Sequence, residues 1–179
     1  MIIRIIISVL FLGLLPALPA AATDPGLLGD TSAVQAQLVA SAAAFEHHDL
    51  RALAKTFIND DSLMIFEGGE VNRGWIDYRD NHIKPELAEI KVVHYTLTEI
   101  HPHIDGNTAW ATFHYHIAGS TAKRTFDSYG IGTAIFRKVK GTWRIVHWHS
   151  TKSPKQPTTH VGAELYQNEA QVRMKSWTL

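Results

Sequence analysis

The sequence contains no cysteine among its 179 residues. This absence excludes disulfide bonds, thiolate metal ligands, thiol nucleophiles and lipid attachment to cysteine. Neither sign of charge is in excess, because 17 Lys and Arg residues balance 17 Asp and Glu residues, and no basic run occurs. We therefore expect no nucleic acid partner, since nucleic-acid-binding surfaces concentrate Lys and Arg. Charged residues make up only 19% of a chain rich in aliphatic side chains, which is typical of a folded domain.

Long hydrophobic runs are also missing, apart from one near the N-terminus. Arg4 precedes an apolar run of about 14 residues (5–18), and Ala20 and Ala22 follow with the spacing of an A-x-A cleavage site. This layout predicts a secretory signal peptide over residues 1–22, with cleavage near Ala22. A signal anchor is the alternative, but the run is shorter than the roughly 20 residues that span a bilayer. We expect an exported, soluble product, periplasmic or secreted, with no stable membrane anchor.

The remainder is predicted to hold a leader over residues 23–30, one domain over residues 31–154 and a tail over residues 155–179. The domain should begin with a helix near Thr31, with Asp30 or Thr31 as its N-cap. Apolar residues then recur at three- and four-residue steps and form one stripe, at Val34, Leu38, Ala42 and Phe45. A second helix is expected over residues 50–57, and a third over residues 75–83 that ends near Pro85.

Apolar residues then alternate with polar ones, which indicates strands. Strands are predicted over residues 63–67, 92–104, 108–118, 125–138 and 143–150, and Gly-containing turn signals separate most of them. Helices followed by a long meander predict an α+β fold with the helices on one face of an antiparallel sheet.

Several motifs resemble the nuclear transport factor 2-like superfamily, and within it the SnoaL-like proteins and the association domain of calcium/calmodulin-dependent protein kinase II. They are Phe66-Glu67, Pro102-His103-Ile104 with Gly106, and Gly141-x-Trp143 with Val146-His147-x-His149. The resemblance covers roughly residues 31–154. It implies a cone-shaped, strongly curved sheet with N-terminal helices on its concave face, an internal pocket and commonly a dimer. The pocket arginines of that association domain align with Tyr115, Ala134 and Ser150, and its histidine with Arg79, so its carboxylate-binding set is not retained.

Strand alternation assigns side chains to the two faces of the predicted sheet. With Tyr115 and Ser150 placed inside the cone by the resemblance, Phe113, Ser128 and Trp148 also point inward, together with Gly130 and Gly132. Those glycines either leave space for a ligand or let the strand bend. The same alternation places Trp143, Ile145, His147 and His149 on the outer face. The helix above is expected to close the pocket. The predicted ligand-binding set is Glu67, Trp75, Tyr78, Arg79, His82, Phe113, Tyr115, Ser128 and Trp148.

Histidine is the unusual component of the composition, with 11 residues. A His-x-His step on a strand puts two imidazoles on one face, where they can converge on a zinc or copper ion. His114, His116, His147 and His149 are therefore candidate metal ligands, although two ligands alone make a weak site. Histidines that are simply structural or exposed are the more common case, and we predict no cofactor.

We predict an exported domain that binds a small apolar or aromatic molecule in an aromatic-lined pocket and forms a homodimer. One alternative is a pocket enzyme of cyclase, isomerase or hydratase type, with His82 or Glu67 as the acid–base residue. The other is an oligomerisation or stress module that uses the outer sheet face, with possible metal binding by the histidine pairs.

Overall fold

The computed structural model describes residues 25–153. The predicted signal peptide (1–22) and tail (155–179) lie outside the described residues. No helix within residues 25–153 has the length and apolarity needed to cross a membrane. The elements in chain order are α1 (Pro25–Glu46), α2 (Leu50–Ala54), β1 (Met64–Glu67), β2 (Glu70–Arg73), α3 (Trp75–Asp77), the π-helix η1 (Tyr78–Ile83), α4 (Lys84–Glu89), β3 (Ile90–Asp105), β4 (Thr108–Thr121), β5 (Thr125–Val139) and β6 (Thr142–Ser153).

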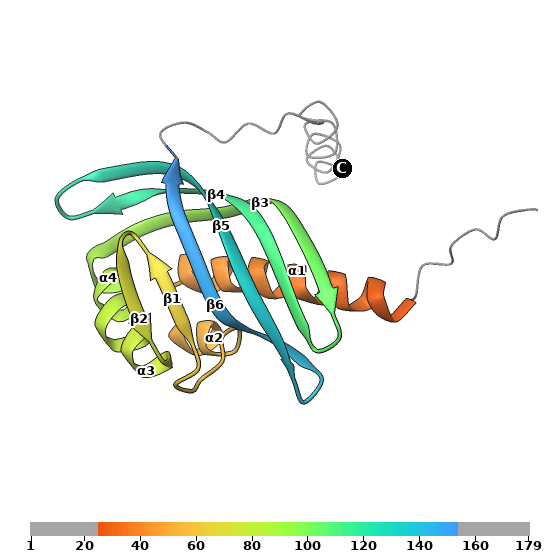
Figure 1. Cartoon of the computed structure of the whole chain (residues 1–179). Coiled ribbons are helices and arrows are strands. Elements are labelled where there is room, and N and C mark those ends of the chain that lie inside the picture. Colours follow the sequence, from red (N-terminus) through yellow and green to blue (C-terminus); the bar gives the residue numbers. More distant parts are fainter. Residues whose placement is uncertain (1–24, 154–179) are drawn as a thin grey trace, which may run out of the picture.

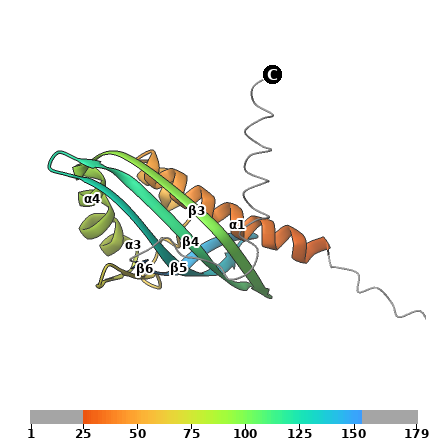
Figure 2. The same ribbon diagram turned by 90° about the horizontal axis from the view of Figure 1, so that it is seen from above.

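The six strands form one strongly curved, open sheet in the order β2-β1-β6-β5-β4-β3. The four long strands form an antiparallel meander, as predicted, but β1 runs parallel to β6 and makes the sheet mixed. Helix α1 lies across the concave side, and α3, η1 and α4 cover its far end (Figures 1 and 2). The predicted α+β class and the helix-lined concave face are confirmed.

Helix α1 is held to the sheet by the apolar stripe that its sequence predicts. Val34, Leu38, Ala42 and Phe45 are all at least nine-tenths buried. The helix is longer than predicted, however, because it begins at Pro25, and proline suits the first turn, where its missing N–H costs nothing. Residues 25–30, which were expected to precede the first helix, are therefore helical.

Asp30 is not the helix cap that the sequence suggested. It lies within α1 and accepts hydrogen bonds from the Lys138 ammonium (2.6 Å) and the Trp143 indole N–H (2.9 Å) of the β5–β6 hairpin. Thr31 is also helical, and its hydroxyl donates to the Leu27 carbonyl oxygen. Asp30 thus links the helix to the sheet.

The connecting segments differ most from prediction. The second helix ends at Ala54 rather than Phe57, and Phe57 forms a parallel bridge with Ile145. The strand β2, which pairs with β1 across the Gly68-Gly69 turn, was not predicted. The helix expected to end near Pro85 instead continues through η1 and α4, because Pro85 occupies the first turn of α4, where proline is tolerated.

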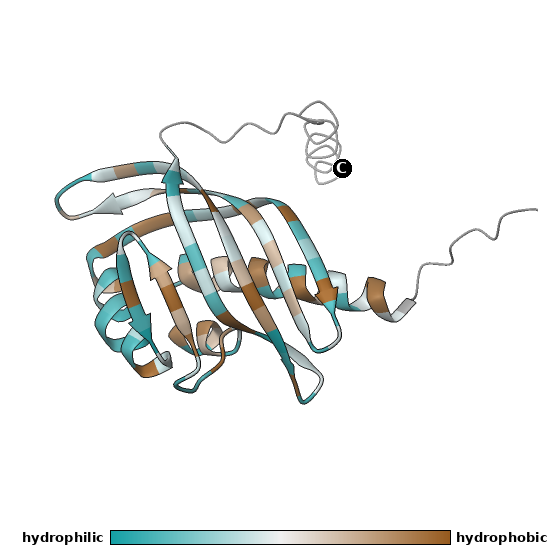
Figure 3. Ribbon diagram, in the orientation of Figure 1, coloured by the Kyte–Doolittle hydropathy of each residue, from teal (hydrophilic) through white to brown (hydrophobic). Residues whose placement is uncertain are grey.

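Strand β6 contains a bulge that reverses the predicted faces of its first half. Ile135 pairs with His147 but Phe136 pairs with Ile145, so Val146 is an extra residue between them. The alternation therefore changes phase at Val146. Trp143 (2% exposed) and Ile145 lie in the core rather than on the outer face, while Trp148 and Ser150 point inward as predicted. Apolar and polar bands still alternate along the strands (Figure 3).

Two glycines of β5 accommodate aromatic rings of β4. Gly130 pairs with Tyr115 and Gly132 with Phe113. A Cβ on either glycine would overlap the ring of its partner. The space left by these glycines is thus filled by the protein's own side chains.

Replacing Gly132 with alanine should destabilise the fold by about 1–3 kcal/mol, because the added methyl group collides with the buried Phe113 ring. Urea unfolding followed by tryptophan fluorescence measures the change. Gly29→Ala is the matched control. Gly29 lies inside α1 with open space around its Cβ position, so alanine there should stabilise by up to about 1 kcal/mol. Equal stability of Gly132→Ala and the wild type would contradict the packing argument.

Candidate functional site

A cavity of about 820 Å³ lies between the concave face of the sheet and the η1–α4 segment. Its inner wall is aromatic, with Phe45, Phe57, Tyr78, Tyr95, Tyr115 and Trp148. Four glutamates also line the cavity, namely Glu67, Glu70, Glu86 and Glu89. Among the described lining residues, the arginine and lysine are Arg124 and Lys152. The size suits a small organic molecule.

The parallel pairing of β1 with β6 creates the polar centre of the cavity. This register places Glu67 beside Ser150 on the inward face. The Ser150 hydroxyl donates a hydrogen bond to Glu67 Oε1 at 2.9 Å. The other carboxylate oxygen, Oε2, lies 4.0 Å from His82 Nε2. Two residues far apart in the chain thus meet at one point of the cavity wall.

His82 is oriented by a chain of hydrogen bonds that begins at Asp77. The Asn72 amide nitrogen donates to Asp77 Oδ2 (3.4 Å), which directs the Asn72 carbonyl oxygen at His82 Nδ1 (2.7 Å). A carbonyl oxygen only accepts hydrogen bonds, so Nδ1 carries the proton. Nε2 of the neutral ring is then a free base. The His82 side chain is 13% exposed, and its Nε2 atom lies 3.8 Å from Glu86 Oε2.

The π-helix brings Tyr78 and His82 to the same wall of the cavity. Their rings pack edge to face, with the ring centroids 5.4 Å apart. Asp77, one residue before Tyr78, is fixed by the Asn81 amide and the Arg73 backbone N–H, each donating at 2.8 Å. A helix with a widened turn is common at functional sites, because it redirects side chains within an otherwise regular segment.

Burial changes the acid–base character of the cavity residues. Loss of hydration raises the pKa of Glu67, while the hydrogen bond from Ser150 and the nearby His82 lower it in part. Burial and the charge of Glu67 raise the pKa of Glu86. Burial, followed by the charge of Glu67, also holds the pKa of Tyr78 and Tyr95 well above the usual value. Both phenols therefore stay protonated at neutral pH.

Six of the nine predicted ligand-binding residues line this cavity: Glu67, Tyr78, His82, Tyr115, Ser128 and Trp148. The other three do not. Trp75 is buried against Phe57, and Phe113 lies beneath Trp148 with ring centroids 4.7 Å apart. Arg79 turns away from the cavity and forms an ion pair with Asp80.

Sequence reasoning missed Asn72, Glu86 and Tyr95. Asn72 belongs to the unpredicted strand β2, so nothing in the pattern pointed to it. Glu86 follows His82 by four residues, a spacing that brings helical side chains together, but the helix was expected to end first. Tyr95 lies on a predicted strand whose inward face was not assigned.

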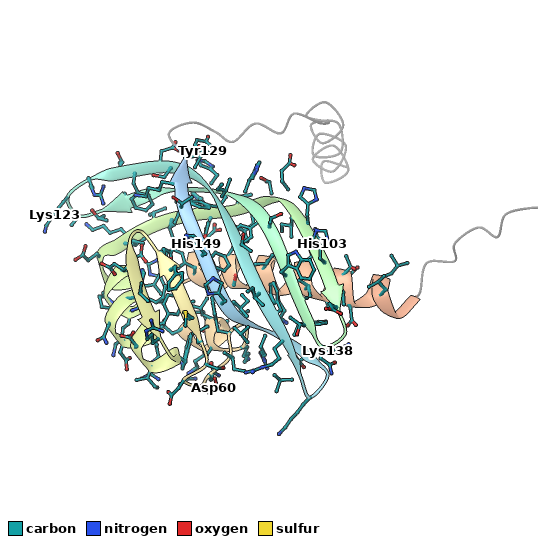
Figure 4. The ribbon with its side chains drawn as sticks, in the orientation of Figure 1. Asp60, His103, Lys123, Tyr129, Lys138 and His149 are labelled. Atoms are coloured by element: carbon teal, nitrogen blue, oxygen red, sulfur yellow. The ribbon has the colours of Figure 1, made fainter. Side chains whose placement is uncertain are left out.

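The histidine pairs lie on the outer face of the sheet. His116 bonds Asp127 at 2.9 Å and stacks on Tyr129, and His147 and His149 both contact the Phe66 ring. His103 and His149 lie on β3 and β6, with two strands between them (Figure 4). Across residues 25–153 no three His, Asp or Glu side chains are grouped so that they could hold a metal ion.

The model of the SnoaL-like domain matches residues 34–153. The chain belongs to the SnoaL-like family. This range includes the whole sheet and every residue that lines the cavity, and it ends with β6. This family match confirms the predicted resemblance to the nuclear transport factor 2-like superfamily, and a solved structure named for that superfamily shares the fold. No curated protein sequence matches the chain.

Three similar solved structures illustrate the range of the fold. Two are named as putative enzymes. The ketosteroid isomerase from Shewanella frigidimarina is 25% identical, with a TM-score of 0.59, and the alignment covers 66% of this chain and 94% of that one. The scytalone dehydratase from Novosphingobium aromaticivorans is 14% identical, with a TM-score of 0.63 and coverage of 76% and 97%. The third is a nuclear transport factor 2-like protein from Salmonella enterica, 19% identical, with a TM-score of 0.64 and coverage of 74% and 96%.

Replacing Glu67 with glutamine should stabilise this SnoaL-like domain at neutral pH. Because the folded-state pKa of Glu67 is raised, ionisation costs stability as the pH rises above its unfolded value of about 4.5. Glutamine keeps the oxygen that accepts from Ser150 and never ionises. The thermal midpoint of Glu67→Gln should therefore exceed that of the wild type at pH 7, and the difference should shrink at pH 4.

Asp49→Asn should have the opposite effect and lower the stability at neutral pH. Asp49 caps α2 by accepting from two backbone N–H groups, and these bonds lower its pKa. Its carboxylate therefore contributes stability at neutral pH that is lost as the pH falls through its folded pKa. A loss of stability in Glu67→Gln at pH 7 would show that Glu67 is not penalised by burial.

Proposed function

We propose that this SnoaL-like domain binds a small, largely apolar molecule in the cavity and catalyses proton transfer on it, with His82 as the base. The observation that supports this proposal most directly is the orientation of His82. Asp77 and Asn72 fix its Nδ1–H, which leaves Nε2 facing an aromatic cavity beside Glu67. A general base needs this arrangement of a free lone pair, fixed direction and excluded bulk water.

The reaction class that fits is isomerisation or elimination next to a carbonyl group. His82 Nε2 would remove a proton from carbon, and the electron pair would move onto the carbonyl oxygen. The protonated Tyr78 and Tyr115 hydroxyls line the same cavity and can donate to that oxygen. The protonated His82 then returns the proton to a different carbon, or donates it to a departing hydroxyl, which leaves as water. The names of the isomerase and dehydratase neighbours support this class.

Replacing His82 with alanine should lower kcat by about 10²- to 10⁴-fold, the usual contribution of a general base. A β,γ-unsaturated ketone and a β-hydroxyketone are suitable probes, because either reaction yields a conjugated enone with strong ultraviolet absorbance. His116→Ala is the control, since His116 lies on the outer face and bonds Asp127. Full activity in His82→Ala would overturn the assignment.

Asn72→Asp tests the positioning of His82 independently. Aspartate can still accept the Nδ1–H, but its negative charge favours the imidazolium form. The acid limb of the kcat/KM pH profile should therefore move to higher pH, while a purely structural role for Asn72 leaves the profile in place.

We also propose that the protein forms a homodimer through the outer face of the sheet. Trp110 (42% exposed) and Ile135 (37%) are cross-strand partners there, and Ile131 (46%) lies on the same face of β5. Large apolar side chains that cluster on an exposed face favour association.

Trp110→Glu should convert such a dimer to a monomer in light scattering coupled to gel filtration, because it places a charge in the apolar patch. The control is Ile76→Glu, because Ile76 is an apolar residue on α3 that is even more exposed (59%) and lies away from the outer sheet face. A monomeric wild type would disprove the proposal.

A further inference from the structure

Carboxylates gather around His82 where the cavity meets solvent, and the side chains of Glu67, Glu86 and Glu70 are 32%, 43% and 73% exposed. Carboxylate oxygens of Glu67, Glu70 and Glu86 each lie 3.8–4.0 Å from its imidazole nitrogens. Within the described residues, no Lys or Arg forms an ion pair with any of these three carboxylates at 4.0 Å or less. Lys152 acts on Glu86 from farther away. Within residues 25–153, the His82 imidazole is thus the one basic group that lies within 4.0 Å of these three carboxylates.

The aromatic wall carries two hydroxyl groups that the described chain leaves without a partner. Tyr78 and Tyr115 are 5% and 7% exposed and both line the cavity. Neither hydroxyl forms a hydrogen bond within residues 25–153. Both residues line the cavity, so their hydroxyls are available to a molecule bound there. Phenol oxygens accept from N–H donors, and aromatic faces attract cations.

We propose that the ligand of this cavity is an organic cation, an aromatic or alkyl amine in its ammonium form. The ammonium group would lie between Glu67 and Glu86 and offer its N–H groups to these carboxylates and to the Tyr78 oxygen. The apolar part would pack on Tyr95, Tyr115 and Trp148. This inference rests on the proposed function only in taking the cavity as the substrate site, and it names the class of that substrate. A neutral ligand would form no ion pair with Glu67 or Glu86, and an acidic ligand would bring a like charge beside them.

Three soluble probes of similar size and different charge test the proposal. They are phenethylamine, which is an ammonium ion at pH 7, the neutral phenethyl alcohol and the anion phenylacetate. Isothermal titration calorimetry with the full mature protein gives the three dissociation constants. We expect the amine to bind at least about tenfold more tightly than the alcohol, and phenylacetate to bind more weakly still.

Glu86→Gln tests how much of the amine affinity comes from charge and how much from apolar contacts. It should weaken amine binding by at least about threefold and leave alcohol binding unchanged, since it removes charge but keeps shape. Asp105→Asn, at the far end of β3, makes the same change in net charge outside the cavity and should leave both constants unchanged. Thermal melting of each variant shows whether it is folded.

The outcomes distinguish this inference from the proposed catalysis. Equal or tighter binding of the alcohol or of phenylacetate overturns the cation proposal, as does the absence of amine binding at millimolar concentration. Either result leaves the His82 activity test unaffected. Selective amine binding that depends on Glu86 supports the proposal even if His82→Ala leaves turnover unchanged, in which case only the assigned catalysis fails.

Discussion

The packing of aromatic rings over glycines on β4 and β5 is the constraint on which the cavity depends. Tyr115 and Phe113 each lie against a glycine of the neighbouring strand, and no other residue leaves room for them. Glycine also lets a strand bend sharply. The curved sheet can then enclose space on its concave side instead of closing flat on α1. Tyr115 lines the cavity, and Phe113 packs beneath Trp148, which also lines it. The same packing therefore shapes the site and stabilises the sheet.

The position of the base depends on a second constraint, the contact between β2 and the π-helix. Asn72 lies on a short edge strand, and Asp77 and His82 lie on the segment that follows it. Hydrogen bonds among the three orient the His82 ring, and the buried Tyr78 ring packs against it edge to face. Because Asp77 is itself held by a backbone N–H and an amide, its carboxylate has little freedom to turn. The direction of Nε2 is therefore set before any ligand arrives, which is the condition for efficient proton transfer.

The sequence predicted the fold more fully than the site, for reasons that particular residues make clear. The stripe at Val34, Leu38, Ala42 and Phe45 and the alternation along β3, β4 and β5 are strong repeating signals that local packing obeys. Trp143 was misplaced because a single bulge residue, Val146, changes the phase of β6, and alternation alone cannot show a bulge. Asn72 was missed because β2 is too short to carry a pattern. Glu67 and Ser150 were expected inside the cone, but their contact arises from a parallel pairing that no local motif encodes.

The chemistry of the cavity shows why its polar groups are hard to explain as parts of the fold. A core stabilises by covering apolar surface, and an aliphatic residue in place of Glu67 would do this without the loss of hydration that raises the carboxyl pKa. Ser150 offers Glu67 one hydrogen bond, and the hydroxyls of Tyr78 and Tyr115 have none within the described chain. These groups converge on one space of about 820 Å³ rather than being scattered over the core. A set of polar groups that line one aromatic cavity and keep hydrogen-bonding capacity there is best understood as complementary to a bound molecule.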